Sequence, residues 1–325
     1  MKEVGRTELM TIDLNSPIDR AYPVQERSLA RGLVRLMRPH QWLKNFLVVP
    51  LPLMDAGVWT SAKLWHVCWA VMVFIAASSL VYTGNDMVDR HRDRAHPEKR
   101  LRPIASGQVP MAFAAVLLGT LMVVLAALLA VVRPTQWWPV LAYLVLNVAY
   151  SRGLKHIPLL DVVIVAVGFQ LRLAQGYVAI HQGLSAWLPV SLLALCLLLI
   201  LGKRRSEIAV SGTSHRPALR GYSLPYLDQL IGLTGALVCV AFLIYINTES
   251  PLGPFRASGA LLSTPFAVLA VFRYLQIVMV QSGGGEPVRT LSRDYFMLLN
   301  AFLWALTLAV LNVLARYPHI IGSLS

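Results

Sequence analysis

Residues 71–93, VMVFIAASSLVYTGNDMVDRHRD, decide the fold of this chain. The first half of the stretch is almost wholly apolar, and Asp86, Asp89 and Asp93 follow directly behind it. An apolar run needs lipid or a protein core around it, whereas clustered carboxylates need water or cations. The stretch therefore predicts a helix that crosses a membrane and ends in an acidic site at the membrane surface.

The rest of the chain repeats the apolar pattern. Its 325 residues are 56% hydrophobic and 14% charged, with a mean hydropathy of +0.60, whereas soluble domains carry about 25% charged residues. Several apolar runs reach the roughly 20 residues that cross about 30 Å of hydrocarbon. The sequence predicts an all-α, polytopic membrane bundle of about nine helices. The expected spans are 43–60, 64–84, 109–131, 136–150, 158–180, 186–202, 226–247, 261–281 and 295–315.

The N-terminal segment differs from the rest. Residues 1–28 are polar and of mixed charge, without the apolar core or small-residue cleavage site of a signal peptide. We expect a disordered cytoplasmic tail there and a single transmembrane domain over 29–325. The cysteines Cys68, Cys196 and Cys239 all fall inside apolar runs, which argues against a disulfide framework or a zinc site.

The residues behind the net charge of +13 are distributed unevenly between the two sides of the predicted membrane. With the N-terminus in the cytoplasm, the connections on the outer side hold only Lys63, Arg133, Arg256 and Arg316. The inner connections hold nearly all other Lys and Arg residues. By the positive-inside rule this asymmetry sets the orientation, and nine spans leave the C-terminus outside. We expect a protein of the plasma (inner) membrane, with anionic lipid or substrate rather than nucleic acid as its partner.

The acidic stretch has the spacing of a metal site. On a continuing helix, Asp86, Asp89 and Asp93 share one face, and Tyr82 extends that face into the bilayer. Such carboxylates repel one another unless cations lie among them, and Mg²⁺ prefers one or two carboxylates together with substrate phosphates. A solvated helix end is the plainer interpretation, but it does not explain why the acids share a face with Tyr82 and Asn85.

A second polar cluster lies where the fourth predicted span returns to the cytoplasm. The run YSRGLKHIPLLD, residues 150–161, supplies Tyr150, Ser151, Lys155 and Asp161. Arg172 follows inside the next span on the same helical face as Asp161, so one substrate or metal cluster could bridge the two. A charge inside a span is costly unless it is paired or faces a polar cavity. Arg172 is therefore a substrate ligand or the ion-pair partner of an acid on a neighbouring helix.

Two further connections carry charge on the same side. The first begins GKRRSE and supplies Lys203, Arg204 and Glu207, followed by Tyr222; cations of this kind suit a polyphosphate. The second, QSGGGEPVRTLSRD, contains Glu286, Arg293 and Asp294, and Arg273 lies within the preceding span. Since the outer connections hold no comparable cluster, we expect a cytoplasmic site for a soluble, phosphate-rich molecule and a lipid headgroup.

These motifs resemble those of the UbiA superfamily of intramembrane prenyltransferases. Its signature NDxxDxxxD is matched by Asn85, Asp86, Asp89 and Asp93. Within the superfamily, RPHQWLKN (38–45), HPEKRLRPIASG (96–107), YSRGLKH and GKRRSE resemble the branch that transfers a phosphoribosyl group to polyprenyl phosphate. The resemblance runs from about residue 31 to residue 300, nearly the whole chain.

The resemblance implies a reaction. The donor would be phosphoribosyl pyrophosphate, the acceptor a decaprenyl-type polyprenyl phosphate in the membrane, and the cofactor Mg²⁺, for synthesis of arabinan precursors of the cell envelope. The implied catalytic residues are Asp86, Asp89, Asp93, Lys155 and Asp161, the three motif aspartates also binding the metal. The implied substrate-binding residues are Lys44, Asn45, Tyr82, Asn85, Tyr150, Ser151, Arg172, Lys203, Arg204, Glu207 and Tyr222.

Two alternatives remain open. Transfer of a prenyl group from prenyl diphosphate to an aromatic acceptor shares the fold and the first motif, but those relatives carry a second motif DxxxD where this chain has Lys155 and the single Asp161. A secondary transporter would place polar residues near the midplane within inverted repeats; here no repeat is evident and the charges lie at one edge. The sequence assigns no oligomeric state.

Overall fold

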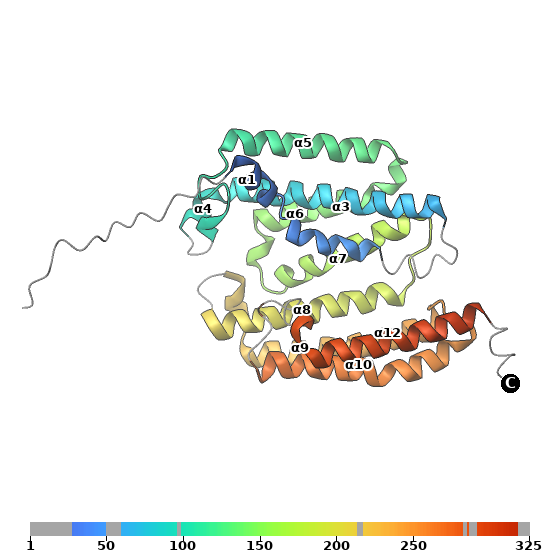
Figure 1. Cartoon of the computed structure of the whole chain (residues 1–325). Coiled ribbons are helices and arrows are strands. Elements are labelled where there is room, and N and C mark those ends of the chain that lie inside the picture. The colour runs from blue at the N-terminus through green and yellow to red at the C-terminus, as the bar shows by residue number, and fades with distance from the viewer. Residues whose placement is uncertain are drawn as a thin grey trace, which may run out of the picture.

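The computed structural model describes residues 28–49, 60–95, 99–212, 217–281, 285 and 291–317, and every regular element within these ranges is a helix. Figure 1 shows the long helices side by side in one bundle. These are α3 (Ser61–Val88), α5 (Met111–Ala130), α6 (Trp138–Arg152), α7 (Leu160–Ala179), α8 (Trp187–Ser211), α9 (Leu224–Thr248), α10 (Arg256–Met279) and α12 (Tyr295–Arg316). The short elements are α1 (Leu29–Leu36), η1 (Pro39–Val48), α4 (Arg90–Arg94), η2 (Lys99–Leu101), η3 (Pro134–Gln136), η4 (Leu154–His156), η5 (Pro217–Gly221) and η6 (Gly253–Phe255).

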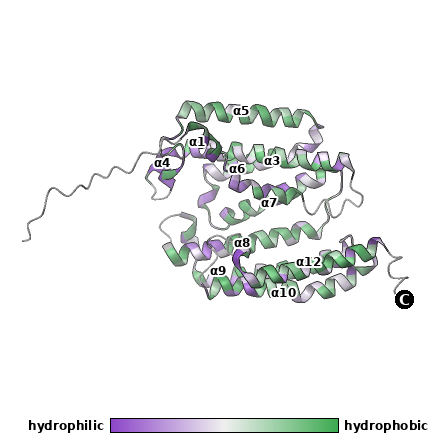
Figure 2. Ribbon diagram, viewed as in Figure 1, coloured by the Kyte–Doolittle hydropathy of each residue, from purple (hydrophilic) through white to green (hydrophobic). Residues whose placement is uncertain are grey.

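Seven of the long helices are long and apolar enough to cross a membrane: α3, α5, α7, α8, α9, α10 and α12. Figure 2 shows hydrophobic residues along their lengths and hydrophilic residues gathered near α4. The eighth, α6, has 15 residues and packs against α3 and α7. The predicted all-α, multi-pass membrane architecture is therefore confirmed. The predicted tail lies almost wholly outside the described residues.

Two helices extend further than the hydropathy predicts. The α3 helix continues to Val88 rather than residue 84, and α8 continues to Ser211 rather than residue 202. Hydropathy marks where lipid ends, not where a helix ends; in α8 the extension contains Lys, Arg and Glu, which are good helix formers. As a result Asp86 and Lys203 project from rigid helices instead of loops.

The described part of the first predicted span, 43–60, is not an α-helix. Its described part belongs to η1, a 3₁₀ helix, and residues 50–59 lie outside the described ranges. In a 3₁₀ helix, side chains three positions apart lie in line. Accordingly Trp42 donates to the Ser79 hydroxyl (3.2 Å) and Asn45 to the Ser78 hydroxyl (3.1 Å). These two hydrogen bonds fix η1 against α3.

Helix packing places α7 at the centre of the bundle and α5 and α12 at its edges. The α7 helix contacts α3, α6, α8 and η1, and it is the most buried of the membrane-spanning helices. Its small residues, among them Ala166, Gly168 and Ala174, allow neighbouring backbones to approach closely. The edge helices instead expose large apolar side chains such as Val123 and Phe302, as helices in contact with lipid do.

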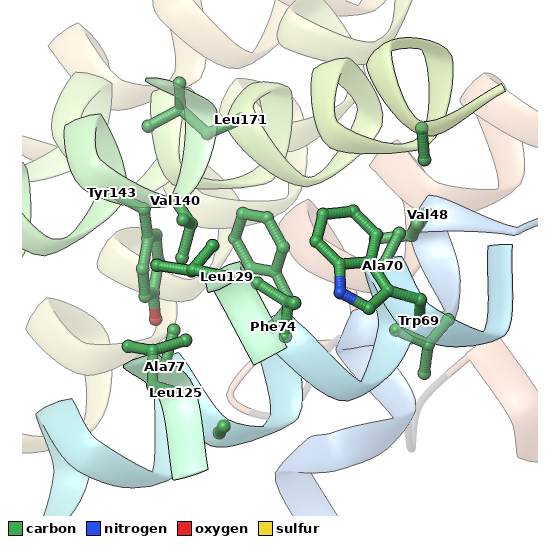
Figure 3. Close-up of a cluster of buried hydrophobic side chains, with 14 residues drawn as sticks. Val48, Trp69, Ala70, Phe74, Ala77, Leu125, Leu129, Val140, Tyr143 and Leu171 are labelled. Atoms are coloured by element: carbon green, nitrogen blue, oxygen red, sulfur yellow. The ribbon is translucent and has the colours of Figure 1, made fainter. Parts of the chain in front are cut away.

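A hydrophobic cluster supports the site (Figure 3). It joins α3, α5, α6 and α7, and its Phe74 and Tyr143 rings pack edge to face with centroids 5.3 Å apart. The Trp69 indole donates to the Leu128 carbonyl (2.8 Å), which ties α3 to α5. The cluster therefore holds α3 and α7, the helices that carry the polar residues, in fixed register.

Candidate active site

The polar side chains gather at one end of the bundle, the end where α3 stops, α7 begins and α8 stops. We call it the charged end. Figure 1 shows α1 and α4 at this end and the last turn of α12 at the opposite one. Most predicted site residues lie near a helix end or in a connection there; those further inside a helix are Lys44, Asn45, Tyr82, Arg172, Lys203 and Arg204. The bundle thus brings together residues that are far apart in the sequence.

The centre of the charged end is a cluster of two aspartates and two arginines. Asp86 is 3% exposed, and its Oδ1 lies 2.6 Å from Arg38 Nη2 and 3.2 Å from Arg102 Nη1. The same Arg102 nitrogen lies 2.7 Å from Asp93 Oδ2, and Asp93 is also buried. Two positive and two negative charges therefore balance inside the cluster, which we call the Asp–Arg cluster.

Arg38 reaches this cluster from an uncommon backbone conformation. It joins α1 to η1 with φ 54° and ψ 62°, the left-handed region, which non-glycine residues rarely adopt. Its guanidinium also lies over the Tyr82 ring, 4.9 Å from the centroid. Strained backbone of this kind persists where surrounding contacts hold it, and it concentrates at functional sites.

Asp89 does not join Asp86 and Asp93, which corrects the expectation of three aspartates on one helical face. The α3 helix ends at Val88, and Asp89, with φ −83° and ψ 2°, separates it from α4. The Asp89 carboxylate instead pairs with Lys155 Nζ (3.6 Å) and Arg92 Nη1 (3.9 Å), although helical backbone hydrogen bonds continue across the bend. Within the described ranges, no three acidic, histidine or cysteine side chains converge as a ready metal site.

Asp86 and Asp93 nevertheless fit a divalent cation as a pair. Both carboxylates direct an oxygen at a single positively charged nitrogen, Arg102 Nη1. The cluster thus already holds a cation between two hard oxygen ligands. Mg²⁺ commonly takes one or two protein carboxylates and completes its shell with water and substrate phosphates. The donor set fits that ion, with Asp89 outside it.

A cleft of about 350 Å³ opens beside Asp86. Its lining is Arg35, Arg38, Pro39, His40, Asp86, Leu101, Arg102 and Pro103. Three guanidiniums in one cleft offer several charge-assisted hydrogen bonds to phosphate oxygens. The arrangement suits a ligand that carries more than one anionic group.

The second predicted cluster lies against the first. The Ser151 hydroxyl donates to Asn85 Oδ1 (2.8 Å), which joins α6 to α3, and Lys155 from η4 reaches Asp89. Tyr150 lies near enough to Arg204 to interact with its charge. The predicted grouping of the motif residues with the YSRGLKH residues is therefore present in space.

Asp161 belongs to a buried network of its own. The Arg204 Nε lies 3.0 Å from its Oδ2, and the Tyr222 hydroxyl donates to its Oδ1 (2.8 Å). Arg204 Nη1 also pairs with Glu207 (2.6 Å). The Tyr222 oxygen accepts the Leu159 N–H (2.6 Å), and burial raises the pKa of Tyr222, which keeps its hydroxyl a donor. Arg204 is the charge partner of Asp161, whereas Arg172 has other partners; a bridge between Asp161 and Arg172 through a substrate or metal stays a prediction.

Arg172 is held by neutral groups. Its Nε donates to Asn45 Oδ1 (2.9 Å), Nη1 to the Gly168 carbonyl (2.7 Å) and Nη2 to the Tyr143 hydroxyl (3.2 Å). The guanidinium also lies near the rings of Phe74, Tyr143 and Phe169. In the part of the chain that the structure describes, no carboxylate pairs with Arg172. The alternative of an acidic partner on a neighbouring helix is therefore wrong for these residues.

Two predicted lysines precede residues of these networks. Lys44 precedes Asn45 on η1, and Lys203 precedes Arg204 on α8; both side chains are exposed.

Sequence reasoning assigned no role to Arg35, Arg38 or Arg102, which line the cleft. A signal was present, because RPHQWLKN contains Arg38 and KRLRPIASG contains Arg102. Asp294, directly before α12, has a structural role. Asp294 caps α12 by accepting the Met297 N–H (2.9 Å) and pairs with Arg273 Nη2 (2.6 Å). Glu286 lies outside the described residues.

The fold and the site together define a class: a multi-pass helical membrane protein whose acidic motif and arginines meet at one end of the bundle. The chain belongs to the UbiA prenyltransferase family, which matches residues 47–306. A decaprenyl-phosphate phosphoribosyltransferase of Mycolicibacterium smegmatis is 32% identical over 305 residues, covering 86% of this chain and 91% of the relative. One of Mycobacterium tuberculosis is 33% identical over 291 residues, covering 86% and 94%.

Solved structures agree on the fold. A UbiA homolog from Archaeoglobus fulgidus bound to GPP and Mg²⁺ matches with a TM-score of 0.63 at 17% identity, over 88% of this chain and 99% of that one. The predicted membership of the UbiA superfamily is confirmed.

Proposed function

We propose that this protein transfers the 5-phosphoribosyl group of phosphoribosyl pyrophosphate to a polyprenyl phosphate and releases pyrophosphate. The observation that carries the proposal is the Asp–Arg cluster beside a cleft lined by three arginines. The names of relatives that are 32% and 33% identical over most of both chains give the reaction class. The orientation expected from the basic connections puts the charged end on the cytoplasmic face of the plasma membrane.

The donor binds in the cleft. Arg35, Arg38 and Arg102 are donors for its phosphate oxygens, and Asp86 and Asp93 are the residues that would hold Mg²⁺. When bound, the ion neutralises negative charge that develops on the departing pyrophosphate. When the donor binds, Arg38 and Arg102 release the carboxylates and donate to phosphate oxygens instead. Only the side chains need to move, because the cleft lies directly beside the cluster.

The reaction itself is a substitution at the ribose C1. The bond from C1 to the pyrophosphate oxygen breaks, and an oxygen of the acceptor phosphate forms the new bond to C1. A phosphate monoester has its second pKa near about 6, so it is already anionic at neutral pH and requires no general base. The protein contributes position and charge stabilisation.

Lys155 and Asp89 form the side of the site that faces α6. Their ion pair, together with the hydrogen bond between Ser151 and Asn85, fixes η4 and the end of α6 against α3. Lys155 carries a positive charge on this side of the site. A cation at this position favours a phosphate ligand over a second metal ion.

The test uses purified protein, radiolabelled phosphoribosyl pyrophosphate and polyprenyl phosphates of several lengths, with Mg²⁺ or with a chelator. We expect labelled lipid and free pyrophosphate in equal amounts, formed only with Mg²⁺. A parallel reaction offers prenyl diphosphate and an aromatic acid. Prenyl transfer faster than phosphoribosyl transfer would reverse the proposal in favour of an aromatic prenyltransferase.

A further inference from the structure

The turn that leads into α7 has a rare backbone conformation. Leu159 has φ 68° and ψ −46°, and the Leu160 N–H donates to the Pro158 carbonyl across it (2.9 Å). A hydrogen bond of this span at a positive φ defines the rare, strained form of the γ-turn. Strained backbone persists only where the surrounding structure holds it. The Leu159 side chain is itself exposed, so other residues must hold the turn.

The connection between α8 and α9 supplies these residues. The Tyr222 hydroxyl accepts the Leu159 N–H (2.6 Å) and donates to Asp161 Oδ1 (2.8 Å). Tyr222 and Asp161 are both buried, so water does not replace these bonds. Gly221 packs so closely on the turn that a Cβ there would lie 2.2 Å from Pro158 Cγ. One buried hydroxyl thus uses its only proton and an acceptor site to hold the γ-turn against η5.

The γ-turn in turn sets the position of Lys155. Backbone hydrogen bonds from Ile157 to Leu154 (3.2 Å) and from Asp161 to Ile157 (3.1 Å) join η4, which carries Lys155, to α7. From η4, Lys155 Nζ reaches to 3.6 Å from Asp89 Oδ2. Both side chains of this pair are partly exposed, and such a pair contributes little to stability. It is too weak to hold the strained turn, so the position of Lys155 follows from the turn.

We infer that Tyr222 is a positioning residue: by holding the turn at Leu159, its hydroxyl places the Lys155 ammonium beside Asp89. This inference rests on the proposed function, in which a cation at this position receives a substrate phosphate. It gives Tyr222 a role different from the predicted contact with substrate. The hydroxyl already has two protein partners, Leu159 and Asp161, on the side away from the cleft lining.

The experiment is a double-mutant cycle on the full chain in detergent. The variants are Tyr222→Phe, which removes only the hydroxyl, Lys155→Ala and the two combined. Tyr226→Phe is the matched control, because Tyr226 is exposed and its ring stacks on that of Tyr222. The measured quantity is kcat/KM for phosphoribosyl pyrophosphate and for polyprenyl phosphate, each at saturating co-substrate.

We expect Lys155→Ala to lower kcat/KM for one of the two substrates at least about tenfold, the scale of one charge-assisted hydrogen bond. Tyr222→Phe should lower kcat/KM for the same substrate. The double variant should lose no more than Lys155→Ala alone, because the effects of residues that act through one another do not add. The control should match wild type.

A second variant reaches the turn without removing the hydroxyl. Gly221→Ala places a methyl group against Pro158 and should displace η5 from the turn, with the same selective loss. Acetylation of Lys155 by an amine-reactive ester, measured by mass spectrometry against Lys63 at the opposite end of the bundle, follows the lysine without turnover. Tyr222→Phe should make Lys155 react about twofold to fivefold faster, the scale of one lost surface ion pair.

Losses that multiply in the double variant overturn the inference, because Tyr222 then acts independently of Lys155. A Tyr222→Phe protein with wild-type kcat/KM for both substrates overturns it too. So does a loss that follows only the folded fraction while the reactivity of Lys155 stays unchanged. A wild type that transfers no phosphoribosyl group contradicts the proposed function instead. The reactivity of Lys155 then decides the inference alone, and an unchanged rate in Tyr222→Phe overturns it.

Discussion

Replacing Arg102 by methionine tests whether the Asp–Arg cluster is an ion-pair site. The change preserves an apolar stem of similar length and removes the guanidinium that joins Asp86 to Asp93. Asp86 keeps Arg38 at 2.6 Å, whereas Arg102 is the charge partner of Asp93. Removing one partner of a buried pair costs about 3–5 kcal/mol. The cost has an upper limit, because the stranded carboxylate can take up a proton instead. For an aspartate with an ordinary pKa, protonation at pH 7 costs about 4 kcal/mol, since each unit between the pH and the pKa costs about 1.36 kcal/mol.

Because the cost of protonation depends on pH, the destabilisation of the variant should depend on pH as well. At pH 5 the same protonation costs about 1.5 kcal/mol, so acidification should remove more than half of the destabilisation. We expect the apparent unfolding temperature of Arg102→Met in detergent to lie well below wild type at pH 7 and close to it at pH 5. Arg100→Met is the control, because Arg100 is exposed on η2, two positions before Arg102, and its loss should change stability by less than about 0.5 kcal/mol.

Magnesium supplies the second half of the test. The substitution leaves two carboxylates without the nitrogen between them, so added Mg²⁺ should raise the unfolding temperature of the variant more than that of wild type. An ion that binds only the folded state stabilises by about 2.7 kcal/mol at a hundred times its dissociation constant. A variant as stable as wild type at pH 7 refutes the ion-pair argument, and a variant insensitive to Mg²⁺ refutes the two-carboxylate cation site.

Three further predictions concern single residues. Asp86→Asn should lower turnover at saturating Mg²⁺ at least about a hundredfold, and undiminished turnover would exclude Asp86 as a ligand. Arg172→Met should leave a stable but inactive protein, because its partners are neutral; thermal stability and turnover of one preparation check this, and a destabilised variant with a fully active folded fraction contradicts it. The hydrogen bond from Arg273 lowers the pKa of Asp294, so its contribution to stability is present above the ordinary aspartate pKa and is lost as pH falls through the lowered value. Thermal unfolding of Asp294→Asn should accordingly differ from wild type at neutral pH and match it in acid.

Hydropathy was sufficient to predict the membrane-spanning helices but not η1. The lengths of the apolar runs place α3, α7 and α12 within a few residues, because lipid thickness sets them. A 3₁₀ helix can have the composition of an α-helix, and it differs in its backbone hydrogen bonds between residues three apart, such as that from the Val49 N–H to the Phe46 carbonyl (2.8 Å). The interruption at Asp89 is likewise invisible to helical periodicity, which treats the motif as continuous.

The residue types of the site were predictable, but their partners were not. The clustering of aspartates and basic residues on one side follows from the sequence. That Asp86 pairs with Arg38, 48 positions away, and Asp161 with Arg204, 43 positions away, depends on helix packing. For this reason the sequence did not predict Arg204 as the partner of Asp161, or Asn45 and Tyr143 as the partners of Arg172.

The neutrality of the Asp–Arg cluster has a consequence for how ligands enter it. A lone phosphate that takes Arg102 leaves Asp93 without a counter-ion, and a lone divalent cation between the aspartates leaves the arginines without theirs. A metal–polyphosphate complex satisfies all four side chains in one double exchange. Metal and donor must therefore raise each other's affinity by the same factor, since linkage between two ligands is reciprocal. In the protein without ligands, the ion pairs of the cluster therefore lower its affinity for a simple anion alone and for a bare cation alone.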